Sequence, residues 1–503
     1  MREHLVAYFE AHHKLVESGA LNLLLAQSQP LILSRQVVEV AGAENPFVTQ
    51  EMVERALSIH GAIMGPRALR PATDAPMGYD RSRAAPASVP YALVAEGFNP
   101  GPGGREPLEA YGTLFQSRYR ALSRILKGRP ELSNLRPVRE LRSTEGASAV
   151  IGMVREVHET SEKHHVVLTV EDETGSLEVL VLRGSPPARA TYLVDEVVGL
   201  KIAFPREPGR LPKVLAVERP EMPPGRSQRR SERTSRVLFL SDTHVGSRSF
   251  LSDAWGMLAD FLKEKGPEPE LAREVEHVVI AGDLVDGIGI YPNQERDLAI
   301  GDIFEQYGEF GKRLRELPSR LNIVVLPGNH DAVCPAEPQP ALPEAITSRL
   351  PENVRAVGNP STFALEGVVV EAYHGRSFDD LIPALPGASY ARPTDVMKRM
   401  LAMRHLAPMY GGRTPLAPLP RDGLVIDPAP DILVTGHAHT YGVDQYRGVL
   451  LLNASTWQAE TEYQRMRNIS PVPAHAALVN LSDLTLRTLD FSGATPAIGS
   501  RAA

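Results

Sequence analysis

The sequence predicts a multidomain α+β protein with a small helical N-terminal domain, a β-barrel in its middle and a C-terminal domain in which strands alternate with helices. Three observations support this prediction. The chain has 503 residues, more than one hydrophobic core usually organises. Residues 146–220 read as short strands of alternating polarity. From about Arg236 onward, apolar strands each end in a polar cluster.

The N-terminal segment, residues 1–62, has the pattern of helices. Apolar residues recur at helical spacing between Leu5 and Leu25, and Thr49 could cap a further helix that holds Met52. We therefore expect a small helical domain. In residues 63–107 this periodicity disappears and Pro and Gly dominate, which predicts a flexible linker.

The next predicted domain, residues 108–222, begins with a helix over Leu108–Arg129 and continues as strands. The five expected strands are Ala149–Val157, Val166–Glu171, Leu177–Val181, Val197–Ile202 and Val214–Val217. A five-stranded barrel of the OB-fold type fits this pattern. The only aromatic residues in 146–220 are Tyr192 and Phe204, few for a surface that stacks bases, so a scaffolding or partner-binding barrel is favoured over a DNA-reading one.

An arginine-rich linker, residues 223–235, separates this domain from the last one. Two interpretations remain open: a solvated interdomain linker, which is favoured, and an arm that contacts phosphates. We expect the C-terminal domain to occupy residues 236–491, followed by a tail over 492–503.

Composition narrows the cellular setting. The net charge of −7 means that any contact with nucleic acid must use a local basic patch. A single cysteine, Cys334, excludes an intrachain disulfide and fits a reducing cytosol. The first residues lack the apolar core of a signal peptide, and the longest uncharged run, Ser18–Ser34, is broken by Pro30. We expect a cytoplasmic protein without a membrane span.

Five apolar strands of the C-terminal domain lead directly into polar residues. In chain order these are Asp242 and His244, then Asp283 and Asp286, then Asn329, His330 and Asp331, then His374, and finally His437 and His439. Because strands of a mostly parallel sheet end at one edge, we expect these residues to meet there. Imidazoles, carboxylates and an amide suit Mn, Fe or Zn better than Ca or Mg alone. Seven of these side chains, namely four imidazoles, two carboxylates and the amide, are too many ligands for one ion and fit two ions with a bridging carboxylate, the arrangement used in phosphoester hydrolysis.

The order DxH, GDxxD, GNHD, H and GHxH resembles the calcineurin-like metallophosphoesterase superfamily. The resemblance implies a β-sandwich flanked by helices. It also implies the metal ligands: Asp242, His244 and His439 for the first ion, Asn329, His374 and His437 for the second, and Asp283 as the bridge. Manganese is the expected metal, with Mg²⁺, Fe²⁺ and Zn²⁺ as alternatives.

The same resemblance implies roles for three further residues. His330 would face the scissile phosphate and either protonate the leaving oxygen or stabilise the developing charge. Asp331 would orient His330, and Asp286 would accept a hydrogen bond from a ligand.

The sequence around the motifs resembles that of the small subunits of archaeal DNA polymerase D, also called polymerase II. The similar segments are 282–295, 327–340, 373–380 and 453–464. This similarity implies 3′→5′ exonuclease activity on single-stranded 3′ ends of DNA, a separate large catalytic subunit as partner, and the sliding clamp as a further candidate partner. The alternatives are a stand-alone phosphatase or phosphodiesterase and a non-catalytic polymerase scaffold. Arg376, just after His374, is expected either to contact a DNA phosphate or to pair with Asp379 or Asp380.

Overall fold

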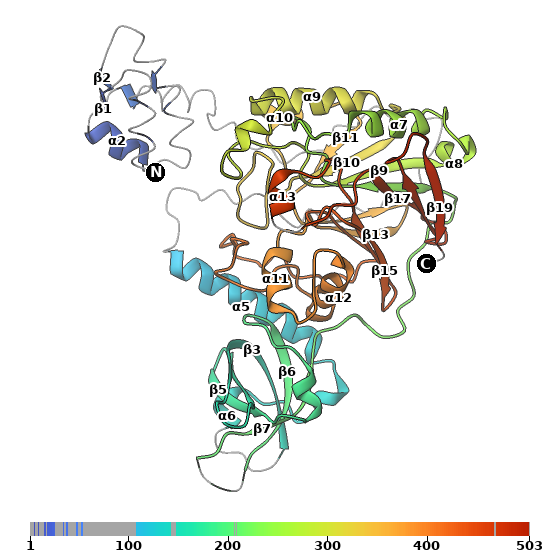
Figure 1. Ribbon diagram of the computed structural model, residues 1–503. Coiled ribbons are helices and arrows are strands. Elements are labelled where there is room, and N and C mark those ends of the chain that lie inside the picture. The colour runs from blue at the N-terminus through green and yellow to red at the C-terminus, as the bar shows by residue number, and fades with distance from the viewer. Residues whose placement is uncertain are drawn as a thin grey trace, which may run out of the picture. The chain divides into compact units, whose positions relative to one another are not determined.

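The structure is a computed structural model (Figure 1). It describes residues 107–141, 147–205, 207, 209–466 and 469–501, together with scattered residues between Leu5 and Val53. The chain divides into two compact units, residues 1–86 and 87–503. In the described part of the chain, no helix is both long and apolar enough to cross a bilayer.

The first unit contains a short helix and a small parallel strand pair. The helix is α2 (Ser18–Leu25), and the strands are β1 (Leu15–Val16) and β2 (Phe47–Val48). The expected helical domain therefore stays a prediction. Thr49 and residues 63–106 lie outside the described residues.

A helix and a closed five-stranded barrel open the second unit (Figure 1). The helices of this region are α5 (Pro107–Leu126), η1 (Pro130–Leu132), α6 (Val138–Leu141) and η2 (Pro186–Arg189). The strands are β3 (Ala147–Glu159), β4 (Val166–Asp172), β5 (Gly175–Val181), β6 (Val197–Ala203) and β7 (Lys213–Glu218). The barrel closes in the order β3-β4-β5-β7-β6, so the three strands expected from alternating polarity and the two expected to close the barrel are all present.

The rest of the second unit contains two sheets. The first runs in the order β11 (Val354–Ala356), β10 (Asn322–Leu326), β9 (Val275–Ala281), β8 (Arg236–Leu240), β17 (His475–Asn480), β18 (Leu486–Asp490) and β19 (Ala497–Arg501). The second runs in the order β12 (Ser361–Leu365), β13 (Val368–Ala372), β14 (Ile432–Thr435), β16 (Val449–Ala454) and β15 (Tyr441–Tyr446).

The sheets pack face to face, with helices on the two outer faces. Along β8, Val237 and Phe239 belong to the core shared with the second sheet, whereas Leu238 and Leu240 face the helices beyond the first. Both faces are buried, which explains why the strand is continuously apolar. The helices beside the first sheet are α7 (Ser252–Leu262), α8 (Pro269–Arg273), η3 (Gln294–Arg296), α9 (Ile303–Arg315) and α10 (Glu344–Thr347). The later helices are α11 (Phe378–Ala384), α12 (Pro393–Met403) and α13 (Glu462–Met466).

Parallel pairing brings the polar clusters to one edge. Strands β8, β9 and β10 are parallel neighbours in the first sheet, and β13 and β14 are parallel neighbours in the second. The carboxyl ends of all five strands therefore point the same way within their sheets. The residues just beyond these ends form the candidate site.

Two segments differ from simple expectations. Residues 492–503 were expected to form a tail outside the C-terminal domain. Within them, Ala497–Arg501 instead form strand β19, which pairs antiparallel with β18 and extends the first sheet. The arginine-rich linker is tied to the sandwich rather than free: Arg226 pairs with Asp431, and Arg233 pairs with both Glu276 and Glu366. These contacts favour a structural linker over a phosphate-contacting arm.

Candidate metal centre

The seven expected metal ligands lie together at the carboxyl edge of both sheets. Two groups that consist only of expected ligands could each hold an ion: Asp242, His244, Asp283 and His439 form one, and Asp283, His374 and His437 form the other. Within each group the candidate ligand atoms lie within 4.8 Å of one another. Asp283 belongs to both groups, which is the position a bridging carboxylate must occupy.

The first group is buried where β8 and β9 end. The Nε2 atom of His439 lies 3.2 Å from Asp242 Oδ1, and the Nε2 atom of His244 lies 3.7 Å from Asp283 Oδ2. The Nδ1 atom of His244 lies 3.1 Å from Asp286 Oδ1, so its N–H donates to that carboxylate and Nε2 remains available as a ligand atom. Asp286 therefore occupies the place expected for a residue that orients a ligand.

In the second group, a hydrogen bond likewise orients the histidine ring. His374 donates its Nδ1–H to the carbonyl oxygen of Ala281, 2.9 Å away. Its Nε2 atom then lies 3.3 Å from Asp283 Oδ2 and 3.0 Å from Asn329 Oδ1. Two imidazoles, the shared carboxylate and an amide oxygen thus converge, and the donor set fits a borderline divalent metal.

Backbone conformation at the site is unusual for non-glycine residues. Five of the seven expected ligands have positive φ angles between 45° and 63°: Asp242, His244, Asp283, His437 and His439. Each such conformation costs about 1–3 kcal/mol, and such residues cluster at functional sites. Gly436 shows how tightly the loops approach, since a Cβ there would lie 2.3 Å from Asp242 Oδ2.

Electrostatics keep the carboxylates charged despite their burial. Burial by itself would raise the pKa of Asp283, but the neighbouring His374 and His330 hold that pKa well below its ordinary value. For His374, burial opposes protonation, yet Asp283 and Asp242 raise the pKa to about 10. The raised pKa of His374 thus reports that the buried carboxylates favour a positive charge beside them, which a bound cation would also supply.

His330 lies at the centre, but a different residue orients it. Its Nδ1–H donates to the carbonyl oxygen of Asp286 at 2.7 Å, and its Nε2 atom lies 3.9 Å from Asp283 Oδ2. The expectation that Asp331 orients His330 is corrected: the Asp331 carboxylate accepts hydrogen bonds from Tyr307 and from the backbone of Gly328 and Leu284. Asp331 is a loop-fixing residue because its two oxygens are already occupied.

The sequence is similar to proteins of known families. The family model that describes the B subunits of DNA polymerases alpha and epsilon matches residues 237–443. The DNA polymerase II small subunit of Archaeoglobus fulgidus is 44% identical over 374 residues, which are 74% of this chain and 75% of that protein. The DNA polymerase II small subunit of Halobacterium salinarum is 35% identical over 495 residues, 94% of this chain and 96% of that protein.

The chain belongs to the family of archaeal DNA polymerase II small subunits. Among solved structures, a Vps29 single mutant from Entamoeba histolytica covers 53% of this chain and 99% of its own, with 17% identity and a TM-score of 0.29. A TM-score this low does not establish a common fold. The assignment to the polymerase small-subunit family therefore depends on the sequence relatives.

Three residues of this polymerase small subunit support the site although the motifs did not reveal them. The Oδ1 atom of Asp379 lies 3.2 Å from His437 Nε2. Gln458 donates to Asp286 at 3.0 Å, and Gln464 contacts the Nδ1 atom of His439. Both glutamines lie in 453–464, a segment whose similarity to the family was visible in the sequence.

Arg376 has neither of its expected acidic partners. It donates to the carbonyl oxygen of Pro335 at 2.9 Å. Asp379 instead contacts His437 and Tyr390, and Asp380 accepts hydrogen bonds from the backbone of Arg413 and Thr414. The contact with Pro335 leaves most of the guanidinium donors of Arg376 for another ligand.

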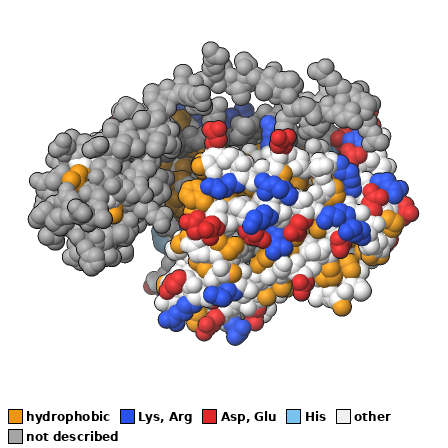
Figure 2. Space-filling model, turned by 90° about the horizontal axis from the view of Figure 1, so that it is seen from above, with side chains coloured by type: hydrophobic (Ala, Val, Ile, Leu, Met, Phe, Trp, Pro, Cys, Tyr) orange, Lys and Arg blue, Asp and Glu red, His pale blue; other side chains and the backbone are white. Residues whose placement is uncertain are grey.

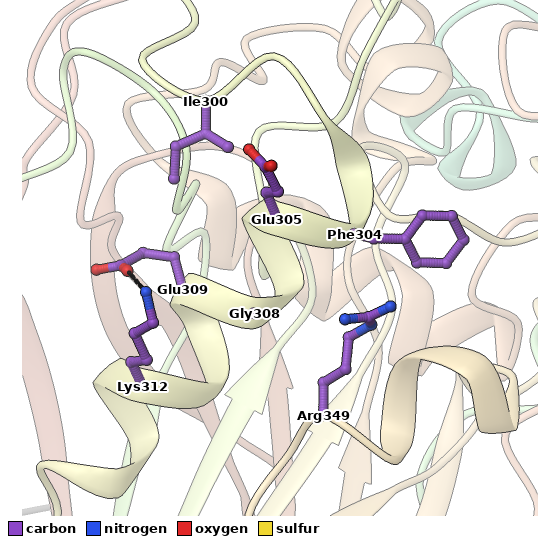
Figure 3. Close-up of a pocket in the computed structure, with 7 residues that line it drawn as sticks. All are labelled: Ile300, Phe304, Glu305, Gly308, Glu309, Lys312 and Arg349. Atoms are coloured by element: carbon purple, nitrogen blue, oxygen red, sulfur yellow. Dashed lines mark hydrogen bonds and ion pairs between the residues drawn. The ribbon is translucent and has the colours of Figure 1, made fainter.

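A separate cavity of about 580 Å³ lies along α9, and none of the expected metal ligands lines it. Figure 3 shows its lining, with Glu309 paired to Lys312 and the Arg349 side chain beside Phe304. On the described part of the face drawn in Figure 2, basic and acidic side chains are interspersed. The coloured part of that face, which is the part the structure describes, shows no broad basic track for nucleic acid.

Proposed function

We propose that this chain is the nuclease-bearing small subunit of a two-subunit DNA polymerase, and that it removes nucleotides from 3′ ends of DNA with the aid of two divalent cations. The observation that carries the proposal is the pair of ligand groups that share Asp283. The family supplies DNA and the polymerase context, because the relatives are named as small subunits of DNA polymerase II.

The proposed ligands follow the geometry. Asp242, His244 and His439 would hold one ion, Asn329, His374 and His437 would hold the other, and Asp283 would contact both. When bound, such ions supply the Lewis acidity that phosphodiester hydrolysis requires. Manganese is the proposed metal, because mixed nitrogen and oxygen donors suit it.

The remaining chemistry belongs to the protein. The Asp286 carbonyl fixes the His330 ring so that Nε2 is the nitrogen nearer Asp283. We propose that this nitrogen meets the leaving oxygen or the charge that develops on the phosphate. The Ala281 carbonyl performs the same positioning for His374, so that its Nε2 atom faces the shared carboxylate.

We further propose that the barrel is an OB-fold that serves mainly to hold the large catalytic subunit. Its closed five-strand order supports the first part of this proposal. Exposed apolar side chains at Val157, Val194 and Leu215 support the second, because a partner could cover them. Buried ion pairs, including Arg118 with Asp422 at 2.7 Å, fix this region to the sandwich.

The proposed function is tested by supplying manganese and comparing three substrates: DNA with a mismatched 3′ end, fully paired DNA and a small chromogenic phosphodiester. Each is assayed with and without the large subunit. The proposal expects preferential release of nucleotides from the mismatched end. Cleavage of the small phosphodiester alone would indicate a general phosphodiesterase, and no cleavage under any condition would indicate a scaffold with a silent site.

A further inference from the structure

The loop that follows Asp286 exposes two large apolar side chains beside the metal centre. Ile288 is 48% exposed and Ile290 is 37% exposed. Single exposed apolar residues are ordinary on a protein surface, but two within a segment of four residues require an explanation. We refer to Gly287–Ile290 as the isoleucine loop.

The isoleucine loop folds directly against His330. The residue before it, Asp286, accepts the Nδ1–H of His330. Gly287 has a φ of 74°, and a Cβ there would lie 2.3 Å from the carbonyl oxygen of His330 and 3.1 Å from Ile290 Cδ1. Only glycine fits this approach, which places Ile290 next to the residue proposed to meet the scissile phosphate.

Two buried glutamines hold the loop in place. Gln294 donates to the Asp286 carbonyl at 2.8 Å and accepts the N–H of Ile290 at 2.9 Å. Gln306 accepts the N–H of Gly287 at 2.9 Å and donates to its carbonyl at 3.1 Å. Because both glutamines are at most 1% exposed, the loop is fixed by the interior. The isoleucines are therefore presented to solvent by a preorganised backbone, which lowers the entropic cost of binding a ligand.

Two arginines lie close to Gln294, one of the glutamines that hold the loop: Arg296 follows it by two residues, and Arg248 contacts Arg296. Arg248 donates through Nε to the carbonyl oxygen of Arg296 at 3.1 Å, and both side chains are exposed. Within the described residues, the structure shows no ion pair between either guanidinium and a carboxylate; Asp297 instead accepts the hydroxyl of Tyr291 at 3.0 Å. The pattern therefore combines an apolar platform with two cations that are free to bind anions.

This combination fits a nucleotide better than a protein surface. A nucleic-acid strand offers apolar base faces and a phosphate on each successive unit, and isoleucine is among the apolar side chains that insert between bases. The platform also adjoins the group that would act on the phosphate. A base that is already unpaired reaches such a platform at lower cost than one that must first leave a duplex.

We infer that the isoleucine loop receives the terminal base of an unpaired 3′ strand, while Arg248 and Arg296 bind phosphates of the same strand. The inference depends on the proposed function for its substrate. It adds the loop as the feature that makes the site prefer frayed or mismatched ends.

The test compares the wild type, an Ile288→Ala/Ile290→Ala double variant and the matched control Leu108→Ala, which removes an 84% exposed side chain from α5. Fluorescence anisotropy without manganese measures affinity for two oligonucleotides of equal length, one ordinary and one with an abasic 3′-terminal residue. The double variant should bind the ordinary end about fivefold to tenfold more weakly, equivalent to about 1–1.4 kcal/mol. It should bind the abasic end as the wild type does, and the control should be unchanged on both.

Equal weakening on both oligonucleotides, or no weakening, would overturn the inference. Unchanged DNA affinity with loss of co-purification with the large subunit would assign the loop to a protein interface instead, which also overturns it. Cleavage assays with manganese are run in parallel. If the wild type cleaves no DNA, the proposed function fails, while the affinity comparison still decides whether the loop binds a base.

Discussion

The Nδ1 atom of His330 lies 2.7 Å from the carbonyl oxygen of Asp286, and this hydrogen bond decides which ring nitrogen can meet a substrate. A carbonyl can only accept, so Nδ1 carries the proton of the neutral ring. Nε2 then lies on the side of the shared carboxylate Asp283, and it must take up a proton before it can protonate a leaving oxygen. The backbone of one metal-binding loop thus positions the side chain that follows the next strand.

Replacing His330 with Ala should lower turnover by about 10²–10⁴-fold, the usual contribution of general acid–base catalysis. Metal content should stay at the wild-type value, because the variant keeps all seven proposed ligands. Elemental analysis alongside single-turnover cleavage checks both points, with His158→Ala on β3 as the control for loss of an exposed imidazole. Since His330 also lies near His244 and Asp286, loss of an ion in the variant would make it a ligand and contradict the assignment.

Replacing Asp379 with Ala should weaken metal binding by about 10–100-fold, the usual effect of removing a residue that orients a ligand. The reason is that Asp379 contacts the ring of His437, a proposed ligand. Burial alone would raise the pKa of Asp379, but the neighbouring His437 lowers it. Titration calorimetry with manganese measures the change. Asp395→Ala, which removes a surface partner of Lys398, is the matched control and should have no effect. Unchanged affinity in the Asp379 variant would show that His437 needs no such support.

Replacing Arg376 with Ala should weaken binding of single-stranded DNA and reduce the salt dependence by about one released counterion. The expectation follows from its position after His374 and from its lack of a pairing carboxylate among the described residues. Affinity at several salt concentrations gives the slope. Arg315→Ala is the control, because Arg315 also donates to a backbone carbonyl, that of Arg349. A lower melting temperature with an unchanged slope would make Arg376 structural.

Glu371 should make stability depend on pH. It is 4% exposed, and burial raises its pKa to about 7 from an ordinary 4.5. Between these two pKa values, the folded chain keeps a proton on Glu371 that the unfolded chain has lost. The contribution of Glu371 to the free energy of unfolding is therefore fully present below the lower pKa and is lost as the pH rises through about 7. Glu371→Gln should therefore gain up to about 3 kcal/mol relative to wild type at pH 8 and almost nothing at pH 4.

Melting curves at the two pH values test this, with exposed Glu352→Gln as the control. A gain for Glu371→Gln that is equal at both pH values would contradict the burial argument.

The sequence predicted that the candidate ligands meet at one edge, because each follows an apolar strand and parallel pairing dictates where strand ends meet. The barrel strands were predictable because short apolar runs between turn residues mark them, with alternating polarity in the first three. Both patterns can be recognised within short stretches of sequence, and the strand order of the sheets then brings the polar residues together.

Other features depend on contacts that no local pattern records. Asp379 matters because α11 approaches the loop after β14, and the partners of Asp331 are set by Tyr307 from α9. The strand over Ala497–Arg501 lacks clear alternation and depends on pairing with β18. The linker arginine Arg233 likewise finds Glu276 and Glu366 only in the folded chain.

The most direct test of the shared-carboxylate centre is the number of manganese ions bound per chain by the wild type and by Asp283→Ala. The account predicts two ions for the wild type and at most one for the variant, because the side chain common to both ligand groups is lost. The two proteins should show similar circular dichroism spectra, so that the difference reports the site. Two tightly bound ions in the variant, or a single ion in the wild type, would contradict the account.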